Sequence, residues 1–459
     1  MGIDVSLCGA SISPPSMNFN MSFAFSSLPE WLIHLETAHT KPIDLGLDRV
    51  RRVKERLEAS SALTLNYPII TVGGTNGKGS TCTFLEQMLL AAGYKVGCHT
   101  SPHIIEFTER ARWAGNDALE SELLPYFQLV HDACEVAPAV SLSYFEFTLL
   151  AIMCWFDAQK PDVVVLEVGL GGRLDASNIF EPMCSVVTNV DIDHVGFLGD
   201  TREAIGFEKA GIFRAYRPAI CADAHPPQRL IDHAAAIGAD LKLIHKDFDF
   251  TVVQDDQRKQ WRFVGEHTRR NSLAMPAMRG DYQLMNASAA LAALDALNEV
   301  LPVPQQAVRL GLANAVVRAR FQVLPGQPVT VLDVAHNPHA ARVLAKNIAQ
   351  MGYAPYTHAV FGAMADKDIV QVLRIMRGQI DHWHLCHLPG SRAASTEQLH
   401  DALIESGFVT DDDHTVQKHV SVKDALTHLA TTVAANDRII IFGSFVTIEQ
   451  ALLGMPRMN

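Results

Sequence analysis

The sequence predicts a two-domain α/β protein in which each domain is built around a mostly parallel β-sheet. Three observations support this prediction. Short runs of β-branched residues alternate with helical patterns, several of these runs are apolar throughout, and the alternation restarts after the Pro/Gly-rich segment 324–328. Strands of a parallel sheet have this composition because helices bury both faces of the sheet.

The expected elements follow in order along the chain, with limits set by apolar periodicity and glycine stops. Before the Pro/Gly-rich segment we expect strands at 68–72, 95–99, 162–168, 185–189 and 217–221, helices at 81–92, 145–156 and 286–300, and a hairpin at 248–264 with its turn at Asp255-Asp256. In the second half we expect strands at 329–334, 357–361, 382–386 and 438–442, and a first helix at 339–351.

The Pro/Gly-rich break sets the expected domain limits. We expect residues 21–317 to form the larger domain, 318–328 a linker, and 329–459 a smaller, Rossmann-like α/β domain. Residues 1–20 precede the first patterned segment, and we expect them to be a disordered extension. A chain of 459 residues is long enough for this organisation, since a domain usually has about 150 residues.

Composition argues against several classes of function. The chain has 38 Lys+Arg against 50 Asp+Glu, and this net charge of −12 disfavours a nucleic-acid partner. The longest apolar stretch, 147–156, has about ten residues, whereas a membrane-spanning helix needs about 20, so we expect no membrane partner. Eight scattered cysteines without a CxxC pair are typical of reduced thiols in the cytoplasm.

The strongest functional signal is the run Gly73-Gly-Thr-Asn-Gly-Lys-Gly-Ser80, between an expected strand and an expected helix. Backbone N–H groups of a glycine-rich turn can approach phosphates closely, and the helix N-terminus adds partial positive charge. Lys78 adds a full charge for the β- and γ-phosphates, and a nearby hydroxyl can reach Mg²⁺. The spacing departs from GxxxxGK[ST] because Gly79 separates Lys78 from Ser80, and a simple glycine turn is the alternative. We therefore predict a nucleotide site and a P-loop ATPase fold for the first domain.

Polar residues also follow two further expected strands, where functional residues of open α/β sheets gather. Glu167 ends one strand and could hold Mg²⁺ beside the phosphates, although a carboxylate hydrogen-bonded at a strand end would look the same. Asp191, Asp193 and His194 follow the next strand. They could bind a metal or a substrate amine, and a structural histidine is the alternative.

Two segments are ambiguous from their residues alone. Lys209 lies in an expected helix-to-strand connection and looks like a surface lysine, since an ammonium would be repelled by a neighbouring Mg²⁺. Asp333 and His336 follow the first strand of the second domain and could contact a ribose, an amine or a carboxylate. Asn337 could simply cap the next helix, with Pro338 in its first turn.

Together these motifs resemble the folylpolyglutamate synthase and dihydrofolate synthase family, within the ATP-dependent Mur-ligase-like superfamily. The resemblance runs from about Trp31 to the final helix. It rests on GTNGKGS (74–80), TSPH (100–103), ERAR (109–112), SYFEFT (143–148), LEVGLGGRLDASN (166–178), DH (193–194), EKAGIF (208–213), RARFQ (318–322), DVAHNPHAA (333–341) and IFGSF (441–445). The order and spacing of these runs make the resemblance specific.

The resemblance implies ATP-dependent amide formation, in which ATP phosphorylates a substrate carboxylate and the amine of L-glutamate attacks the acyl phosphate. It implies ATP contacts for Thr75, Asn76, Gly77, Lys78, Gly79, Ser80, Asn286, Arg320, Asp333 and His336. The implied catalytic residues are Lys78, Glu167, His194 and Lys209, and the implied Mg²⁺ ligands are Ser101, Glu167 and His194. The family carries Lys209 as a carboxylated lysine, which would remove the objection about its charge.

Within the family, the segments 42–49 and 143–146 resemble the pteroate-binding segments of bifunctional bacterial enzymes. This implies a dihydropteroate site formed by Leu45, Gly46, Leu47, Asp48, Ser143, Tyr144, Phe145, Glu146, Leu174, Asp175 and Ala176. The expected substrates are 7,8-dihydropteroate, tetrahydrofolates and L-glutamate, and the family suggests a monomer. One departure is Ala319, where the family often has glycine, and we expect little effect from it.

Two other functions are compatible with a P-loop. A Mur-type amino-acid ligase of cell-wall synthesis would be expected to carry an additional N-terminal domain, whereas the P-loop strand is expected to begin at residue 68. A non-ligase P-loop ATPase would not need a second α/β domain with a DVAHNP run. We therefore expect a folate ligase.

Overall fold

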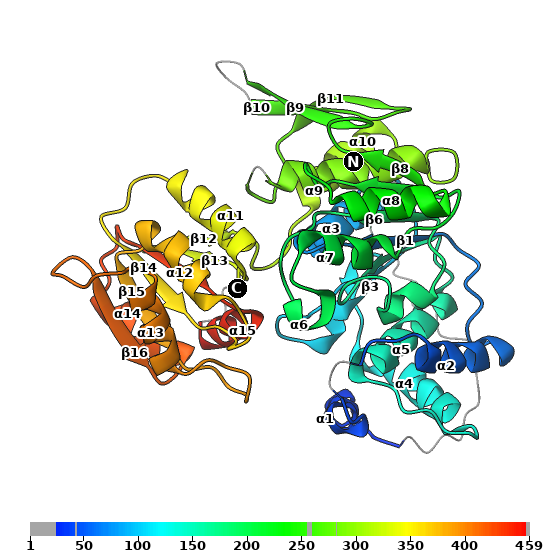
Figure 1. Ribbon diagram of the computed structural model, residues 1–459, viewed down its shortest axis with the longest axis horizontal. Helices are drawn as coiled ribbons and strands as arrows, with labels where there is room; N and C mark the ends of the chain where they lie inside the picture. Colours follow the sequence, from blue (N-terminus) through cyan, green and yellow to red (C-terminus); the bar gives the residue numbers. More distant parts are fainter. Residues whose placement is uncertain (1–23, 42–43, 255–258, 281, 456–459) are drawn as a thin grey trace, which may run out of the picture.

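A computed structural model describes residues 24–41, 44–254, 259–280 and 282–455. Two α/β domains lie side by side, and the chain passes from the larger to the smaller after α10 (Figure 1). The expectation of a disordered extension at residues 1–20 lies outside the described residues. No helix in the described part of the chain is long and apolar enough to span a bilayer.

The larger domain contains an eight-stranded sheet. Six of its strands, β1, β2, β5, β6, β7 and β8, run parallel, and β3 and β4 are antiparallel additions at one edge. In spatial order the strands are β4 (Asn116–Asp117), β3 (Ala111–Trp113), β2 (Val96–His99), β5 (Val163–Glu167), β1 (Ile69–Gly73), β6 (Cys184–Val187), β7 (Pro218–Cys221) and β8 (Asp240–Leu243). The expected strands of this domain are confirmed to within two residues at each end.

Alternate residues of these strands enter cores on opposite faces of the sheet. Ile70 and Val72 of β1 pack into one core, whereas Ile69 packs into another. The first face is covered by α3 (Lys78–Ala91), α9 (Tyr282–Ala296) and α10 (Gln305–Asn314). The other is covered by α1 (Leu28–Ala38), α2 (Asp48–Ala59), α4 (Glu120–Glu135), α5 (Tyr144–Gln159), α6 (Val195–Leu198), α7 (Arg202–Ala210) and α8 (Gln228–Ile237). This double coverage explains why the strands are apolar throughout.

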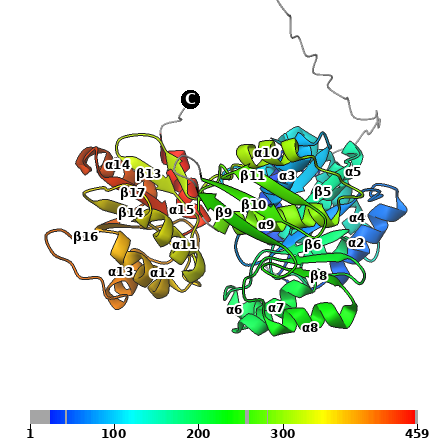
Figure 2. The same ribbon diagram turned by 90° about the horizontal axis from the view of Figure 1, so that it is seen from above.

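A separate three-stranded antiparallel sheet lies beside α9 and α10 (Figure 2). It consists of β9 (Asp249–Gln254), β10 (Lys259–Val264) and β11 (Arg269–Ala274). The pairing of β9 with β10 confirms the expected hairpin, although its turn lies outside the described residues. The third strand was not expected from the sequence.

The smaller domain has a six-stranded sheet with helices on both faces. Its strands, in spatial order, are β12 (Gln322–Leu324), β13 (Val329–Leu332), β17 (Arg438–Phe442), β14 (Thr357–Phe361), β15 (His382–Cys386) and β16 (Thr415–His419). The helices α11 (Pro338–Ala349), α12 (Ile369–Met376) and α13 (Thr396–Glu405) cover one face, and α14 (Val422–Thr432) and α15 (Phe445–Gly454) the other. All strands except β12 run parallel, which confirms the expected smaller parallel domain.

The segment 318–328 differs from the linker we expected. Its residues 322–324 form β12, which pairs antiparallel with β13 and therefore belongs to the sheet of the smaller domain. Just before this strand, Ala319 has φ +54°, in the left-handed region that favours glycine. Glycine, the residue that the resemblance implies at this position, would adopt this conformation with less strain than alanine.

Candidate active site

The glycine-rich loop connects β1 to α3, as expected, and the loop that follows β6 fixes its shape. Thr75 N–H donates to the Asn189 carbonyl and Asn76 N–H to Asn189 Oδ1, both at 2.9 Å. Gly77 is the N-cap of α3, and its φ of +83° allows the helix to begin at Lys78, three residues before the expected start. A Cβ at Gly77 would collide with the side-chain amide of Asn286.

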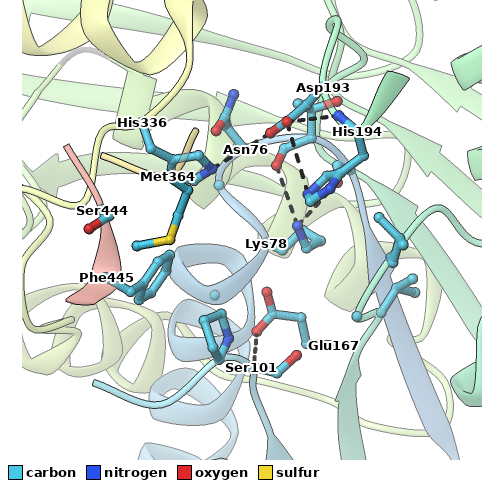
Figure 3. A pocket seen from close by; sticks show the side chains of 18 of the residues that line it. Asn76, Lys78, Ser101, Glu167, Asp193, His194, His336, Met364, Ser444 and Phe445 are labelled. Atoms are coloured by element: carbon cyan, nitrogen blue, oxygen red, sulfur yellow. Dashed lines mark hydrogen bonds and ion pairs between the residues drawn. The ribbon is translucent and has the colours of Figure 1, made fainter. Parts of the chain in front are cut away.

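A central cavity of about 460 Å³ lies between the two domains (Figure 3). The larger domain contributes Thr75, Asn76, Gly77, Lys78, Gly79, Ser101, Glu167, His194 and Lys209, and the smaller domain contributes His336, Met364, Lys367, Ser444 and Phe445. Every residue proposed to be catalytic or to bind the metal therefore lines one space. Figure 3 shows Lys78 between Glu167 and Ser101 on one side and Asp193 and His194 on the other.

Lys78 and Glu167 give the cavity opposite charges. Lys78 Nζ donates to the carbonyls of Gly74 and Thr75, at 3.2 and 3.3 Å. Glu167 Oε2 accepts from Ser101 N–H at 3.0 Å, and Oε1 has no hydrogen bond from the described residues. Burial raises the pKa of Glu167, and the charge of Lys78 opposes this rise.

The interpretation of Lys209 as a surface lysine is wrong. Lys209 lies in the last turn of α7, not in a connection, and is only 3% exposed. Its amphipathic helix buries Ile205 and Ala210 together with it. Burial, followed by the charge of Lys78, lowers the pKa of Lys209 to about 7. A substantial fraction of this amine is therefore neutral at physiological pH.

Asp193 joins the two domains at the top of the central cavity. Its carboxylate pairs with Lys367 Nζ at 2.8 Å and accepts from Asn337 Nδ2 at 3.0 Å, and both partners belong to the smaller domain. Burial opposes ionisation, but contacts such as that with His336 hold the pKa of Asp193 well below its ordinary value. The neighbouring Asp191 makes a second bridge, to His339 Nδ1 at 2.8 Å. These aspartates therefore hold the domains together, a role that the sequence did not indicate.

His194 follows Asp193 directly and is the N-cap of the short helix α6, with φ +52°. Its side chain is 38% exposed and faces the central cavity. Burial lowers the pKa of His194 to about 4, the charge of Asp193 opposes this fall, and the charge of Lys367 adds to it. The ring is therefore neutral at pH 7 and available as a ligand.

A second cavity, of about 340 Å³, opens on the other side of the glycine-rich loop and brings together Ser80, Asn286, Arg320 and Asp333. Asp333 is buried and accepts from the N–H groups of Phe321 and Ala335, both at 2.8 Å. Arg320 lines this cavity and the central one. His336 lies in the central cavity only, and Asn337 caps α11 as expected.

A third cavity, of about 250 Å³, collects most residues of the expected dihydropteroate site. Leu45, Gly46, Ser143, Phe145, Glu146, Leu174, Asp175 and Ala176 line it. Three expected residues lie elsewhere. Leu47 packs against the core beside α2, the Asp48 side chain is 92% exposed, and Tyr144 packs against Arg110.

The carboxylates of the third cavity are already bound to neighbouring protein groups. Glu146 accepts from Arg49 Nη2 at 3.0 Å and from Ser143 N–H at 2.7 Å, within the capping box of α5. Asp175 accepts from the N–H groups of Leu170 and Ser177, at 2.8 and 2.9 Å. These two acidic residues therefore shape the walls of the cavity.

The residues present fit a Mg²⁺ ion that is also bound by phosphate. The described residues contain no group of three or more His, Cys, Asp or Glu that could hold a metal ion. Mg²⁺ usually takes one or two carboxylates, with substrate phosphates and water completing its coordination. Glu167 lies next to the glycine-rich loop, since a Cβ at Gly79 would lie 3.7 Å from its Oε2, and its Oε1 accepts no hydrogen bond from the described residues.

Several residues of the central cavity were not predicted. Ser444 and Phe445 lie in the IFGSF run, and Arg110 lies in the ERAR run, so the motifs pointed to them without assigning a role. Met364 and Lys367 lie in the connection between β14 and α12 and carry no motif. Only the folded chain brings this connection to Asp193.

Comparison with known proteins identifies the family. Residues 139–294 match the Mur ligase middle domain, and residues 319–445 match the glutamate ligase domain of Mur ligases. A dihydrofolate synthase/folylpolyglutamate synthase of Escherichia coli (strain K12) is 39% identical over 429 residues, which cover 94% of this chain and 96% of the relative. The chain belongs to the dihydrofolate synthase/folylpolyglutamate synthase family. This membership favours the folate ligase over the cell-wall ligase and the non-ligase ATPase.

Solved structures of the family share the whole architecture. E. coli FolC in complex with DHPP and ADP has a TM-score of 0.86 at 38% identity, with 94% of this chain and 98% of that chain covered. A bifunctional folylpolyglutamate synthase/dihydrofolate synthase with Mn, AMPPNP and L-glutamate bound has a TM-score of 0.84 at 38% identity, with the same coverage. The two-domain fold of this chain is therefore the fold of the dihydrofolate synthase/folylpolyglutamate synthase family.

Proposed function

We propose that the protein is an ATP-dependent ligase that adds L-glutamate to two kinds of acceptor. With 7,8-dihydropteroate it forms dihydrofolate, and with tetrahydrofolates it forms folylpolyglutamates. Membership of a family named for both reactions supports this function. The cofactors are ATP and Mg²⁺.

The observation that carries the proposal is the continuity of the third cavity with the central one. Six residues line both: Ser101, Pro102, Arg110, Gly169, Leu170 and His194. An acceptor whose ring system occupies the third cavity can therefore extend its carboxylate toward Lys78. A non-ligase ATPase needs no acceptor site such as the third cavity.

The chemistry proceeds in two transfers. An oxygen of the acceptor carboxylate attacks the γ-phosphorus of ATP, and ADP leaves, which gives an acyl phosphate. The amine of L-glutamate then attacks the acyl carbon, the C–O bond to phosphate breaks, and the new amide loses a proton. Lys78 and the N–H groups of residues 77–79 offset the charge of the transferring phosphoryl group. Bound Mg²⁺ would supply further charge neutralisation there, held by Glu167, His194 and Ser101.

The second cavity would hold the nucleoside part of ATP. It adjoins Gly77 and Ser80 and contains Asn286, Arg320 and Asp333. Arg320 also lines the central cavity, where it could contact the phosphates. The nucleotide would thus contact both domains, and its binding would favour their closed arrangement.

Carboxylation of Lys209 is part of the proposal. A neutral amine attacks CO₂, and the resulting carbamic acid loses a proton to give a carbamate. Burial and the charge of Lys78 favour the neutral amine that this step requires. The product replaces a positive charge by a negative one next to the proposed metal ligands, which suits a divalent cation.

We further propose that the enzyme acts as a monomer in the cytoplasm. The central cavity already contains every residue proposed to be catalytic or to bind the metal, so the proposed chemistry calls on no residue of a second copy. The seven described cysteines are all unpaired and buried, which suits a reducing compartment.

Phosphate release tests the function directly. ATP cleavage should require both L-glutamate and a pterin acceptor, since the acyl phosphate forms only on the acceptor carboxylate. The assay compares dihydropteroate, tetrahydrofolate and no acceptor. Equal turnover without any acceptor would refute the ligase and favour a non-ligase ATPase.

A further inference from the structure

Arg110 is a partly buried cation that forms no ion pair with the described residues, although the charge of Glu167 acts on it from a distance. Its Nε donates to His103 Nδ1 at 2.8 Å, and its guanidinium packs over the rings of Phe107 and Tyr144, 5.5 and 5.6 Å from their centroids. Within the described part of the chain this guanidinium has no ion pair, and its two Nη groups make no hydrogen bond. Arginines in such surroundings usually have an anionic partner, because desolvating an unpaired charge is costly.

The position of Arg110 shows where that partner would bind. The residue lines both the central cavity and the third cavity, and so lies where the two meet. His103 Nδ1 accepts from Nε of Arg110 at 2.8 Å, and this hydrogen bond fixes the orientation of the guanidinium. The remaining N–H groups of the guanidinium form a fork that suits a carboxylate.

The two acceptors differ in whether they bring a carboxylate to this place. Dihydropteroate ends in one carboxylate, which reacts. A tetrahydrofolate ends in glutamate, whose γ-carboxylate reacts while its α-carboxylate remains as an anion. The two carboxyl carbons of glutamate are separated by four C–C bonds, or about 5 Å when extended. When the γ-carboxylate lies beside Lys78, the α-carboxylate therefore lies a short distance back toward the third cavity.

We propose that Arg110 binds the α-carboxylate of the terminal glutamate of folate acceptors, and so serves the second ligation and not the first. This assignment rests on the proposed function of the site. It makes Arg110 a specificity residue for glutamylated acceptors within a site that both acceptors share. The stacking on Phe107 and Tyr144 holds the fork in place without neutralising it.

The test is steady-state kinetics of Arg110→Gln with three acceptors: dihydropteroate, tetrahydrofolate, and a tetrahydrofolate analogue in which γ-aminobutyrate replaces glutamate, so that the α-carboxylate is missing. With tetrahydrofolate, kcat/KM should fall about 10- to 100-fold, mainly through KM, because a charge-assisted hydrogen-bond pair is lost. With dihydropteroate and with the analogue, kcat/KM should stay within about threefold of the parent value.

Two further measurements keep the result interpretable. Arg229→Gln is the matched control, because Arg229 also lies over an aromatic ring, 4.8 Å from the centroid of Phe207, but lines none of the three cavities. The parent enzyme itself should prefer tetrahydrofolate to the analogue by about tenfold or more, which requires no variant. Arg110→Lys should recover only part of the loss, since lysine keeps the charge but not the fork.

Several outcomes would overturn the assignment. An equal loss with all three acceptors would make Arg110 a structural or phosphate-contacting residue. A rise in the KM of L-glutamate with both natural acceptors would mean that it binds the incoming amino acid. Absence of acceptor-dependent phosphate release in the parent enzyme would instead refute the proposed function, so the two failures are distinguishable.

Discussion

Lys78 is the only cationic side chain in the glycine-rich loop, and its Nζ already lies over the carbonyls of Gly74 and Thr75. Replacing it with alanine removes a fixed charge from the path of the phosphoryl group. We expect Lys78→Ala to lower kcat by about 10²- to 10³-fold for both acceptors. Phosphate release measures this loss. Lys95→Ala, which removes an exposed lysine of the same domain, is the control. A Lys78→Ala enzyme within twofold of the parent would mean that the loop is merely a turn.

Lys209 is buried and lines the same cavity as the proposed metal ligands, where an ammonium would disfavour Mg²⁺. We expect Lys209→Ala to be nearly inactive, and a short carboxylic acid in the buffer to restore part of the activity by occupying the vacated space. The same acid should not rescue Lys78→Ala, which lacks a cation. With ¹³C-bicarbonate, the parent should show a carbamate carbon signal that Lys209→Ala lacks. An unmodified, ordered ammonium at Lys209 in an active ATP complex would refute carboxylation and leave the phosphate loop unaffected.

Gly77, before α3, needs to be glycine both for its backbone conformation and for the space that a side chain would require. Gly93, just after α3, has the same kind of backbone conformation but free space around it, so it distinguishes the two effects. Gly77 and Gly93 both have left-handed φ, +83° and +95°, but only a Cβ at Gly77 would meet another group, the amide of Asn286. We expect Gly93→Ala to cost about 1–2 kcal/mol of unfolding free energy, the usual cost of that backbone region. Gly77→Ala should cost more and also weaken ADP binding. Urea unfolding and calorimetric titration measure the two effects, and equal costs with unchanged ADP affinity would contradict this account.

A row of histidines on the sheet of the smaller domain makes it sensitive to acid. His384 Nδ1 lies 3.0 Å from His419 Nε2, and its Nε2 lies 3.4 Å from His358 Nδ1. Burial, followed by the neighbouring histidines, lowers the pKa of His384 to about 3. The folded state therefore favours the neutral ring, whereas an unfolded histidine takes up its proton near pH 6.5.

Stability from this histidine is complete above pH 6.5 and is lost as the pH falls toward 3. For one such group the loss is at most about 1.4 kcal/mol per pH unit. We expect the thermal midpoint of the protein to fall between pH 7 and 5, above the range in which carboxylates titrate. His384→Gln should flatten that dependence, and the exposed His387→Gln should not. An unchanged pH profile in His384→Gln would show that this ring does not contribute.

The sequence predicted the elements that carry the site because strand ends are local features. Glu167 and the glycine-rich loop follow runs of apolar, β-branched residues, and such runs mark buried strands without knowledge of the partner strands. Lys209 was misjudged, because its burial depends on how α7 packs and not on the polar Glu-Lys pair itself. The positions of Lys367 and Met364 were not predictable, since they depend on how one domain faces the other.

Both domains together form the central cavity, and Asp193 links them through Lys367 and Asn337. Asp193→Asn keeps the shape of the side chain and removes its charge. We expect kcat/KM to fall about tenfold with both acceptors, as a charged hydrogen bond between the domains is lost. The radius of gyration from small-angle scattering should rise at the same time.

Two comparisons test this account of Asp193. Glu58→Gln breaks an ion pair with Lys54 inside α2, away from the other domain, and should change neither quantity. Adding Lys367→Ala to Asp193→Asn should cost little more than Asp193→Asn alone, because the two residues form one interaction. A fall in activity without any change in scattering would mean that Asp193 acts only on its neighbour His194.

Each of the two large sheets takes its strands from one continuous part of the chain: β1 to β8 from residues 69–243, and β12 to β17 from residues 322–442. During synthesis on the ribosome, the first sheet can therefore complete its hydrogen bonding before the second has emerged, as domains usually fold as units. The nascent chain at that stage would hold a formed phosphate loop without Lys367, Asn337 or Phe445, which come later. Such a chain also lacks Arg320 and Asp333 of the proposed nucleoside site, so translation order alone delays nucleotide turnover until the smaller domain has been made.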